Sequence, residues 1–268
     1  MNTASPTPYI MEDPREAMRL EMKVDPKAWV RKYLAHRVPP GAEILSVGCG
    51  PGVILREVCA LNSSITGTGI DISAERIQEA NRQNPAGSRV KLVQGDAHAI
   101  EFPSDSFDLV YSRMLFEYLH DKEQAAAEMV RVCRPGGSVL LQDLDGQLLW
   151  NYPEDAVVQR AVERVVAGLA STGFDPFVGR KLFSLAHNAG LKNIEVQVEC
   201  YHLIAGEIDS TILRQWELKL EIAVPRIARI LGDEDAAKEQ AQRFLEYLRR
   251  PDTLTYSNVF TVTGVKPL

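Results

Sequence analysis

Three glycines at every second position, Gly48, Gly50 and Gly52, separate a short apolar stretch from an apolar-periodic segment that starts at Val53. A strand, a glycine turn and a helix in this order let a nucleotide-like ligand lie against the main chain. Glycine has no side chain to hold the ligand off, and it accepts unusual backbone angles. About twenty residues further on, Asp71 ends a second apolar stretch, where a carboxylate can accept hydrogen bonds from two ribose hydroxyls.

Apolar stretches that end in polar or small residues recur along the chain and predict the strands of a parallel sheet. The carboxyl ends of such strands meet at one edge, and ligands bind there. The stretches before Asp96 and before Ser112 end in this way, as does the one that follows Arg134-Pro135-Gly136-Gly137. The predicted strands cover residues 44–47, 67–71, 90–95, 107–111, 138–142, 194–202 and 258–265.

Four segments occur in an order and spacing that resembles the class I S-adenosylmethionine-dependent methyltransferases: ILSVGCGPG, GIDIS, GDAHAIEFPSDSFDLVYSR and EMVRVCRPGGSVLLQD. The nearest likeness is to the ubiquinone-biosynthesis and small-molecule natural-product branch, over about residues 40–145 and more loosely over 178–204. The resemblance implies an α/β fold, with a Rossmann-like, doubly wound, seven-stranded and mostly parallel sheet whose last strand is antiparallel. It also implies S-adenosyl-L-methionine as cofactor and S-adenosyl-L-homocysteine as product.

The resemblance assigns residues to the cofactor site. The carboxylate of Asp71 is expected on the ribose hydroxyls, and Asp96 is expected to accept from the adenine amino group with the Ala97 amide beside the ring. The full set is Val47, Gly48, Cys49, Gly50, Gly52, Asp71, Ile72, Asp96, Ala97, Arg113 and Arg19.

Two positions depart from the family pattern. Ser46 stands where an acid usually supports the glycine turn, so that support must be made differently. Tyr118 stands where many relatives have a histidine, and His120 follows two positions later. Tyr118 and His120 are the candidate catalytic residues, since an imidazole titrates near working pH. The alternative for His120 is a histidine at a helix start, without a role in catalysis.

Residues 1–40 are predicted to form an N-terminal helical cap, in which Tyr9, Glu16 and Arg19 are candidates for ligand contact. Residues 41–268 form the methyltransferase domain, with helical insertions at about 146–180 and 205–256. Apolar residues spaced by three and four predict helices over 153–172, 182–190, 213–231 and 233–249, with a kink at Pro225. Helices inserted before the last strand would lie over the carboxyl edge as a substrate lid.

The candidate substrate-binding residues are Tyr9, Met114, Tyr118, Asp143, Trp150 and Trp216. Asp143 and Asp145 follow the predicted fifth strand, where substrate pockets form. Paired acids can bind magnesium, but the other ligands of such a site have no counterpart in the sequence, so no metal is predicted. The alternative for Trp150 is packing beneath the lid.

The chain has 268 residues, a length that suits one domain with insertions. A net charge of −6 disfavours a nucleic-acid partner, which needs a basic face. No apolar run is long enough for a membrane span, and no secretory signal is apparent. Four scattered cysteines suggest a reduced, cytoplasmic protein. The predicted partner is a small organic acceptor, and the lid helices offer a surface for a homodimer.

Two other functions remain open. One is a protein that keeps the fold and the cofactor pocket without methylating, either a cyclisation catalyst or a pseudoenzyme, because fold does not determine function. The other, more remote, is an NAD(P)-dependent oxidoreductase, suggested by the Tyr-x-x-x-Lys spacing of Tyr118 and Lys122. In short-chain dehydrogenases that pair lies much further beyond the glycine turn. The acceptor atom, whether oxygen, nitrogen or carbon, is left open.

Overall fold

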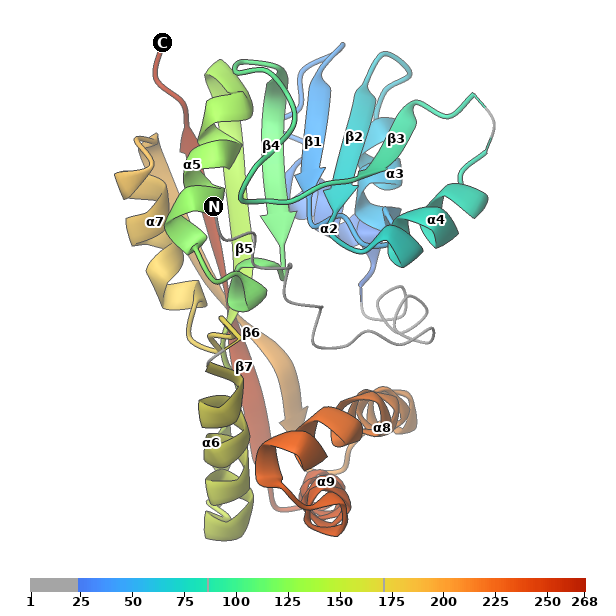
Figure 1. Ribbon diagram of the computed structural model, residues 1–268, viewed down its shortest axis with the longest axis vertical. Helices are drawn as coiled ribbons and strands as arrows, with labels where there is room; N and C mark the ends of the chain where they lie inside the picture. The colour runs from blue at the N-terminus through green and yellow to red at the C-terminus, as the bar shows by residue number, and fades with distance from the viewer. Residues whose placement is uncertain (1–23, 86, 171) are drawn as a thin grey trace.

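The computed structural model describes residues 24–85, 87–170 and 172–268, apart from the side chains of residues 147–149. At its centre is a seven-stranded sheet with the strand order β3-β2-β1-β4-β5-β7-β6 (Figure 1). Strands β1 to β5 pair in parallel, and β7 runs antiparallel to both β5 and β6, which confirms the predicted fold class. The strands are β1 (Glu43–Val47), β2 (Thr66–Asp71), β3 (Val90–Gln94), β4 (Phe107–Arg113), β5 (Cys133–Tyr152), β6 (Lys192–Ala205) and β7 (Leu254–Val265).

Helices cover both faces of the sheet and bury one apolar core on each side. On one face lie α2 (Pro26–Tyr33), α3 (Val53–Ala60) and α4 (Ala74–Arg82), and on the other lie α5 (Lys122–Val132) and α7 (Leu182–Asn188). The side chain of Ser73 caps α4 and that of Asp121 caps α5, each accepting from a main-chain amide in the first turn. Short 3-10 turns occupy Phe116–Tyr118 and Gly179–Lys181.

A separate group of helices lies beyond the carboxyl edge of the parallel strands (Figure 1). It consists of α6 (Ala156–Ala170), α8 (Ser210–Leu231) and α9 (Glu234–Leu248), which we call the helical subdomain. Val158, Trp216 and Phe244, one from each helix, share a core of their own. The predicted helices of both insertions are therefore confirmed, and Pro225 lies inside α8. None of the helices in the described ranges is long and apolar enough to cross a membrane.

The three strands β5, β7 and β6 extend beyond the ends of the other strands of the sheet and connect to the helical subdomain (Figure 1). The predicted end of β5 at residue 142 was wrong, because the strand runs on to Tyr152. After an irregularity between Asp145 and Trp150, β5 pairs with β7 again, Trp150 opposite Tyr256 and Tyr152 opposite Leu254. Strand β7 accordingly begins earlier than predicted, and β6 extends to Ala205.

Candidate functional site

The glycine turn has the backbone that the sequence predicted. Gly48, Gly50 and Gly52 all have positive φ, at 70°, 51° and 75°, a region in which residues with a side chain are strained. A Cβ atom at Gly48 would lie 2.9 Å from Leu115 Cδ1, and one at Gly52 would lie 3.1 Å from Leu92 Cδ1. Gly48 and Gly52 therefore have little room for a side chain, and α3 starts directly behind the turn.

Asp71 braces this turn from the end of β2. Its Oδ2 accepts a hydrogen bond from the Gly50 amide at 2.9 Å, and its Oδ1 accepts one from the Ser73 amide at 3.0 Å. Arg76 Nη2 lies 3.7 Å from Oδ1. Ser46 and Val47 are buried in β1. The support expected from an acid at position 46 thus comes from Asp71, while its contact with ribose stays a prediction.

Ile72 and Asp96 lie side by side at the same edge. Strands β2 and β3 pair Asp71 with Gln94, so Ile72 lies level with the residue before Asp96. Ile72 is 37% exposed, and the side chain of Asp96 is 44% exposed. An accessible apolar side chain beside a carboxylate suits a flat ring that carries an amino group. Ala97 is buried and packs into the core.

His98 holds the Asp96 carboxylate in place. Asp96 Oδ1 accepts from the His98 amide at 2.9 Å and lies 2.7 Å from His98 Nδ1. Partial burial opposes ionisation, but these hydrogen bonds outweigh it, so the pKa of Asp96 lies below its usual value. Sequence reasoning missed His98, although it stands two positions after a candidate acid, the spacing of an Asx turn.

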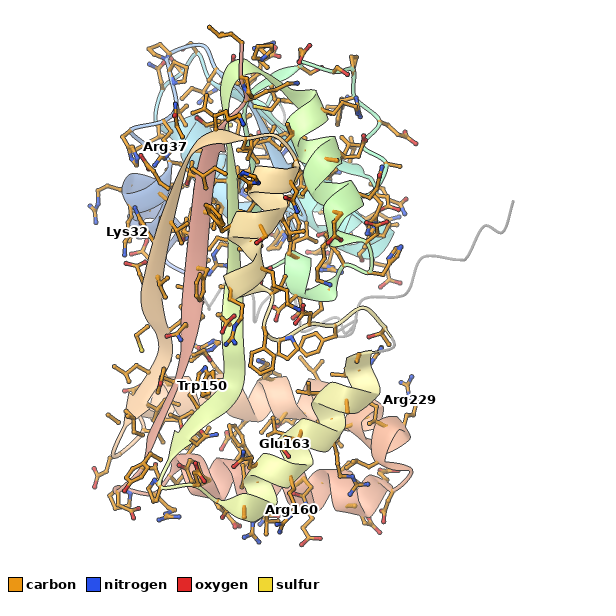
Figure 2. All side chains as sticks on the ribbon, turned by 90° about the vertical axis from the view of Figure 1, so that its left-hand side faces the viewer. Lys32, Arg37, Trp150, Arg160, Glu163 and Arg229 are labelled. Carbon is orange, nitrogen blue, oxygen red and sulfur yellow. The ribbon has the colours of Figure 1, made fainter. Side chains whose placement is uncertain are left out.

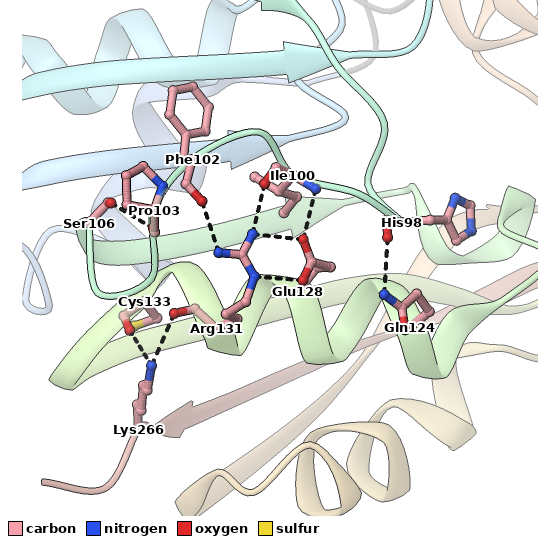
Figure 3. Close-up of polar contacts among 10 residues, drawn as sticks. All are labelled: His98, Ile100, Phe102, Pro103, Ser106, Gln124, Glu128, Arg131, Cys133 and Lys266. Atoms are coloured by element: carbon pink, nitrogen blue, oxygen red, sulfur yellow. Dashed lines mark hydrogen bonds and ion pairs between the residues drawn. The ribbon is translucent and has the colours of Figure 1, made fainter.

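The loop that carries Asp96 and His98 is clamped to α5 by two charged residues (Figure 3). Arg131 donates to the carbonyl oxygens of Phe102 at 2.9 Å and Ile100 at 2.7 Å, and Glu128 Oε2 accepts from the Ile100 amide at 2.9 Å. The hydrogen bond from Arg131 lowers the pKa of Glu128. The sequence signal for this clamp is an acid and a base three residues apart on a helix.

His120 is on the cofactor side of the site. It is exposed, and its ring centroid lies 4.2 Å from that of His98. Its backbone packs against Gly173, where a Cβ would lie 2.9 Å from His120 Cα. His120 is absent from the wall of the apolar cavity described below. The geometry therefore does not support His120 as the base that serves an acceptor in that cavity.

Arg113 points to the face of the sheet that α2 covers. Its Nη2 lies 3.2 Å from the Tyr201 hydroxyl. There it lines a cavity of about 270 Å³ together with Trp29, Lys32, Tyr33, Gln142, Glu199, Cys200, Tyr201 and Val259. A contact between Arg113 and the methionine carboxylate stays a prediction.

An apolar cavity of about 180 Å³ lies within the helical subdomain, and we call it the helical cavity. This exceeds the cavity of about 150 Å³ that is known to hold a benzene molecule. Tyr118 and Trp216, both predicted to bind substrate, are in its wall. The remaining wall is Val158, Ala161, Val162, Val165, Val166, Leu169, Phe174, Pro176, Lys219, Leu220, Ala223, Arg226, Ile227, Ile230, Gln240, Ala241 and Phe244.

Asp143 does not face a substrate. It is fully buried inside β5, where Oδ2 accepts from the Glu117 amide at 3.2 Å and Oδ1 from the Leu144 amide at 2.8 Å. Burial, followed by the nearby Glu117 carboxylate, raises the pKa of Asp143 well above its usual value. Asp145 is also buried and pairs with Arg180. The prediction of Asp143 as a substrate ligand is therefore wrong, because the strand continues through it.

Trp150 and Met114 are not part of the wall of the helical cavity. Trp150 is at the junction between the sheet and the helical subdomain, with its ring 6.5 Å from that of Phe177 (Figure 2). This packing is the alternative that the sequence offered for Trp150. Met114 follows β4 with φ of 53°, and no contact of its side chain with the cavity is present. Tyr9, Glu16 and Arg19 lie outside the described residues.

Comparison with known proteins agrees with this geometry. Residues 45–141, which run from β1 into β5 and include the glycine turn, Asp71 and Asp96, match the family model "Methyltransferase domain". The chain belongs to the class I S-adenosylmethionine-dependent methyltransferases. The cofactor of this family is S-adenosylmethionine. The described edge has a glycine turn of positive φ, the buried acid Asp71, and an accessible apolar and acidic surface at Ile72 and Asp96.

The curated relatives that match this methyltransferase align with only part of its chain and with only part of their own length. It is 36% identical to the 2-methyl-6-phytyl-1,4-hydroquinone methyltransferase of Synechocystis over 121 residues, which are 45% of this chain and 36% of that protein. The match therefore spans little more than a third of that relative's length.

Two solved structures share the fold at low identity. The phosphoethanolamine N-methyltransferase 2 of Haemonchus contortus aligns with a TM-score of 0.56 and 18% identity, over 90% of this chain and 53% of that one. The [4+2]-cyclase SpnF aligns with a TM-score of 0.56 and 20% identity, over 90% of this chain and 82% of that one. At these identities the likeness concerns the fold alone.

Proposed function

We propose that this methyltransferase moves the methyl group of S-adenosylmethionine to an oxygen, nitrogen or carbon atom of a small organic acceptor, a secondary metabolite whose apolar body lies in the helical cavity. The observation that carries the proposal is the segment after β4. Leu115 in this segment contacts the glycine turn at Gly48, and Tyr118, three residues later, lines the helical cavity. One short segment thus borders both the cofactor edge and the acceptor cavity.

Methyl transfer requires mainly that the cofactor and the acceptor are held in the correct relative position. The sulfonium cofactor supplies an activated methyl group, and the reaction is an in-line displacement. The glycine turn, Asp71 and Asp96 would hold the cofactor, while the apolar wall around Tyr118 would orient the acceptor and exclude water. Such positioning can lower a barrier by about 7–11 kcal/mol. The Tyr118 hydroxyl can donate to or accept from a polar group of the acceptor. A base is required only where the acceptor must lose a proton.

The helical subdomain would act as the lid of this site. Its three helices lie beyond the carboxyl edge, where the cofactor of an α/β fold binds. The lid assignment rests on this position and on the apolar lining of the helical cavity.

Calorimetric titration of the purified protein with S-adenosylmethionine, S-adenosylhomocysteine and NADH tests the cofactor assignment. Micromolar binding of the first two without binding of NADH supports the proposal, and binding of NADH alone would overturn it. Incubation with radiolabelled S-adenosylmethionine and a metabolite extract then tests the reaction. A labelled product supports methyl transfer, whereas an isomerised product without label would indicate a cyclisation catalyst.

A further inference from the structure

Arg226 lies in the wall of a mostly apolar cavity, whose other polar wall residues are Tyr118, Lys219 and Gln240. It lies on α8 between Ala223 and Ile230, which also line the helical cavity, and it is half-buried. Burial lowers the pKa of Arg226, and repulsion from Arg229 adds to this effect. The neighbouring Lys219 is placed differently, with its ammonium 4.6 Å from the centre of the Trp216 ring.

The other arginines of α8 and α9 either have acidic partners or are exposed. Arg214 and Arg249 both pair with Glu217, at 3.2 Å and 2.9 Å. Arg243 pairs with Asp155 at 3.3 Å. Arg229 is exposed and lies at the outer end of α8 (Figure 2). Arg226 forms an ion pair with none of the carboxylates in the described ranges, although a half-buried charge costs free energy unless an opposite charge meets it.

Gln240 brings a second polar group to the same cavity wall from α9. Its Oε1 is buried and has no hydrogen-bond partner among the described residues. Arg226 and Gln240 thus line one cavity from two different helices, α8 and α9. A buried acceptor without a partner costs free energy, and a half-turn of the amide would put the donor Nε2 in its place.

We propose that the helical cavity selects acceptors that carry a carboxylate on an apolar body, with Arg226 binding the carboxylate and the Gln240 amide donating to it. The inference rests on the proposed function only in naming this ligand as the methyl acceptor. A guanidinium donates through a planar fork that matches the two oxygens of a carboxylate. The Gln240 amide can turn its Nε2 toward the same group. A neutral ligand of equal size would leave the Arg226 charge without a partner.

The test compares decanoic acid with 1-decanol as calorimetric probes at pH 8, where the acid is ionised. We expect the wild-type protein to bind decanoate at least tenfold more tightly than decanol. Arg226→Gln should abolish this preference while leaving decanol binding unchanged. Arg229→Gln is the matched control, because it removes the same charge one helical turn away at an exposed position, and it should keep the preference. Arg226→Lys keeps the charge and should retain part of it.

Equal binding of the two probes by the wild-type protein, or binding of neither, would overturn the inference. A preference that survives Arg226→Gln would also overturn it. Thermal unfolding of each variant identifies any that fails to fold, in which case Gln240→Leu provides the comparison and should reduce the preference. S-adenosylhomocysteine is titrated in parallel. Loss of its binding with the acid preference intact would refute the proposed function but not the acid site.

Discussion

Replacing Asp71 with alanine should destabilise the protein and weaken cofactor binding together. The carboxylate is buried and accepts from two main-chain amides, those of Gly50 and Ser73. Alanine leaves both amides without an acceptor, at a cost of about 1–2 kcal/mol each, so the free energy of unfolding should fall by about 2–4 kcal/mol. For a chain of this size each kcal/mol lowers the melting temperature by roughly 2–4 °C, which gives a fall of about 4–16 °C.

The cofactor effect is separable from the loss of stability. A carboxylate on the ribose hydroxyls contributes about 1.5–3 kcal/mol through charge-assisted hydrogen bonds, so Asp71→Ala should weaken S-adenosylhomocysteine binding by tenfold or more at a temperature where the variant is folded. Glu75→Ala is the matched control, since Glu75 is an exposed acid in the first turn of α4. A melting temperature within about 1 °C of wild type would refute the bracing of the turn. A large fall with unchanged affinity would refute the ribose contact.

Three further predictions concern other parts of the site. Burial and the Glu117 carboxylate raise the pKa of Asp143 in the folded protein. In the unfolded chain the pKa of an aspartate is about 4, so the folded state loses stability as the pH rises above that value and Asp143 ionises. Asp143→Asn should therefore lose less thermal stability than wild type between about pH 5 and pH 8; equal losses would contradict this sign. Arg131→Ala removes the clamp on the Asp96 loop and should lower the free energy of unfolding, measured by urea titration, by about 2–3 kcal/mol. The control is Arg82→Ala at an exposed position, which should cost about 0.5 kcal/mol or less. Similar losses for the two variants would show that the clamp is weak. Tyr118→Phe should slow methyl transfer while S-adenosylhomocysteine binds as before, and full activity would make Tyr118 a packing residue.

Local patterns predicted the parts of the site that are built from consecutive residues. The glycine turn, the end of β2 at Asp71 and the loop at Asp96 each depend on a strand followed directly by a turn, and such a unit is visible as apolar residues next to glycine or an acid. The long β5 could not be predicted in this way. Acids are disfavoured in strands, and the partner that makes Asp145 acceptable, Arg180, is 35 residues away in the sequence.

The positions of some single residues depend on contacts between distant segments and could not be predicted from the sequence. His120 resembles a displaced catalytic histidine in the sequence, but the fold places it on His98. Arg226 resembles a residue on the solvated face of an amphipathic helix. Only the packing of α6 and α9 against α8 converts that position into a cavity wall. Helical periodicity identifies the apolar stripe of one helix. It does not predict which residues beside that stripe a second helix will cover.

The position of the helical cavity relative to the cofactor edge is set by hydrogen-bonded strands. Pairing between β5 and β7 continues from Asp145 opposite Asn258, through the irregularity, to Tyr152 opposite Leu254. At the irregularity, Arg180 donates to both oxygens of Asp145. Gly179 packs so closely that a Cβ would lie 2.9 Å from Asp145 Cβ. Asp143, predicted to bind substrate, and its neighbour Asp145 thus lie inside β5, where Asp145 ties the strand to the 3-10 turn at Gly179–Lys181.

This arrangement separates the residues predicted to bind the cofactor from those proposed to select the acceptor. The glycine turn, Asp71 and Asp96 depend on β1, β2, β3 and α5, whereas the helical cavity is formed mainly by α6, α8 and α9. The segment that ends at Tyr118 borders both. Substitutions in the cavity wall should therefore change which acceptor binds without changing cofactor affinity. The acid preference proposed for Arg226 should be alterable independently of the methyl donor, because its side chain belongs to the wall of the helical cavity and not to the edge proposed to bind the cofactor.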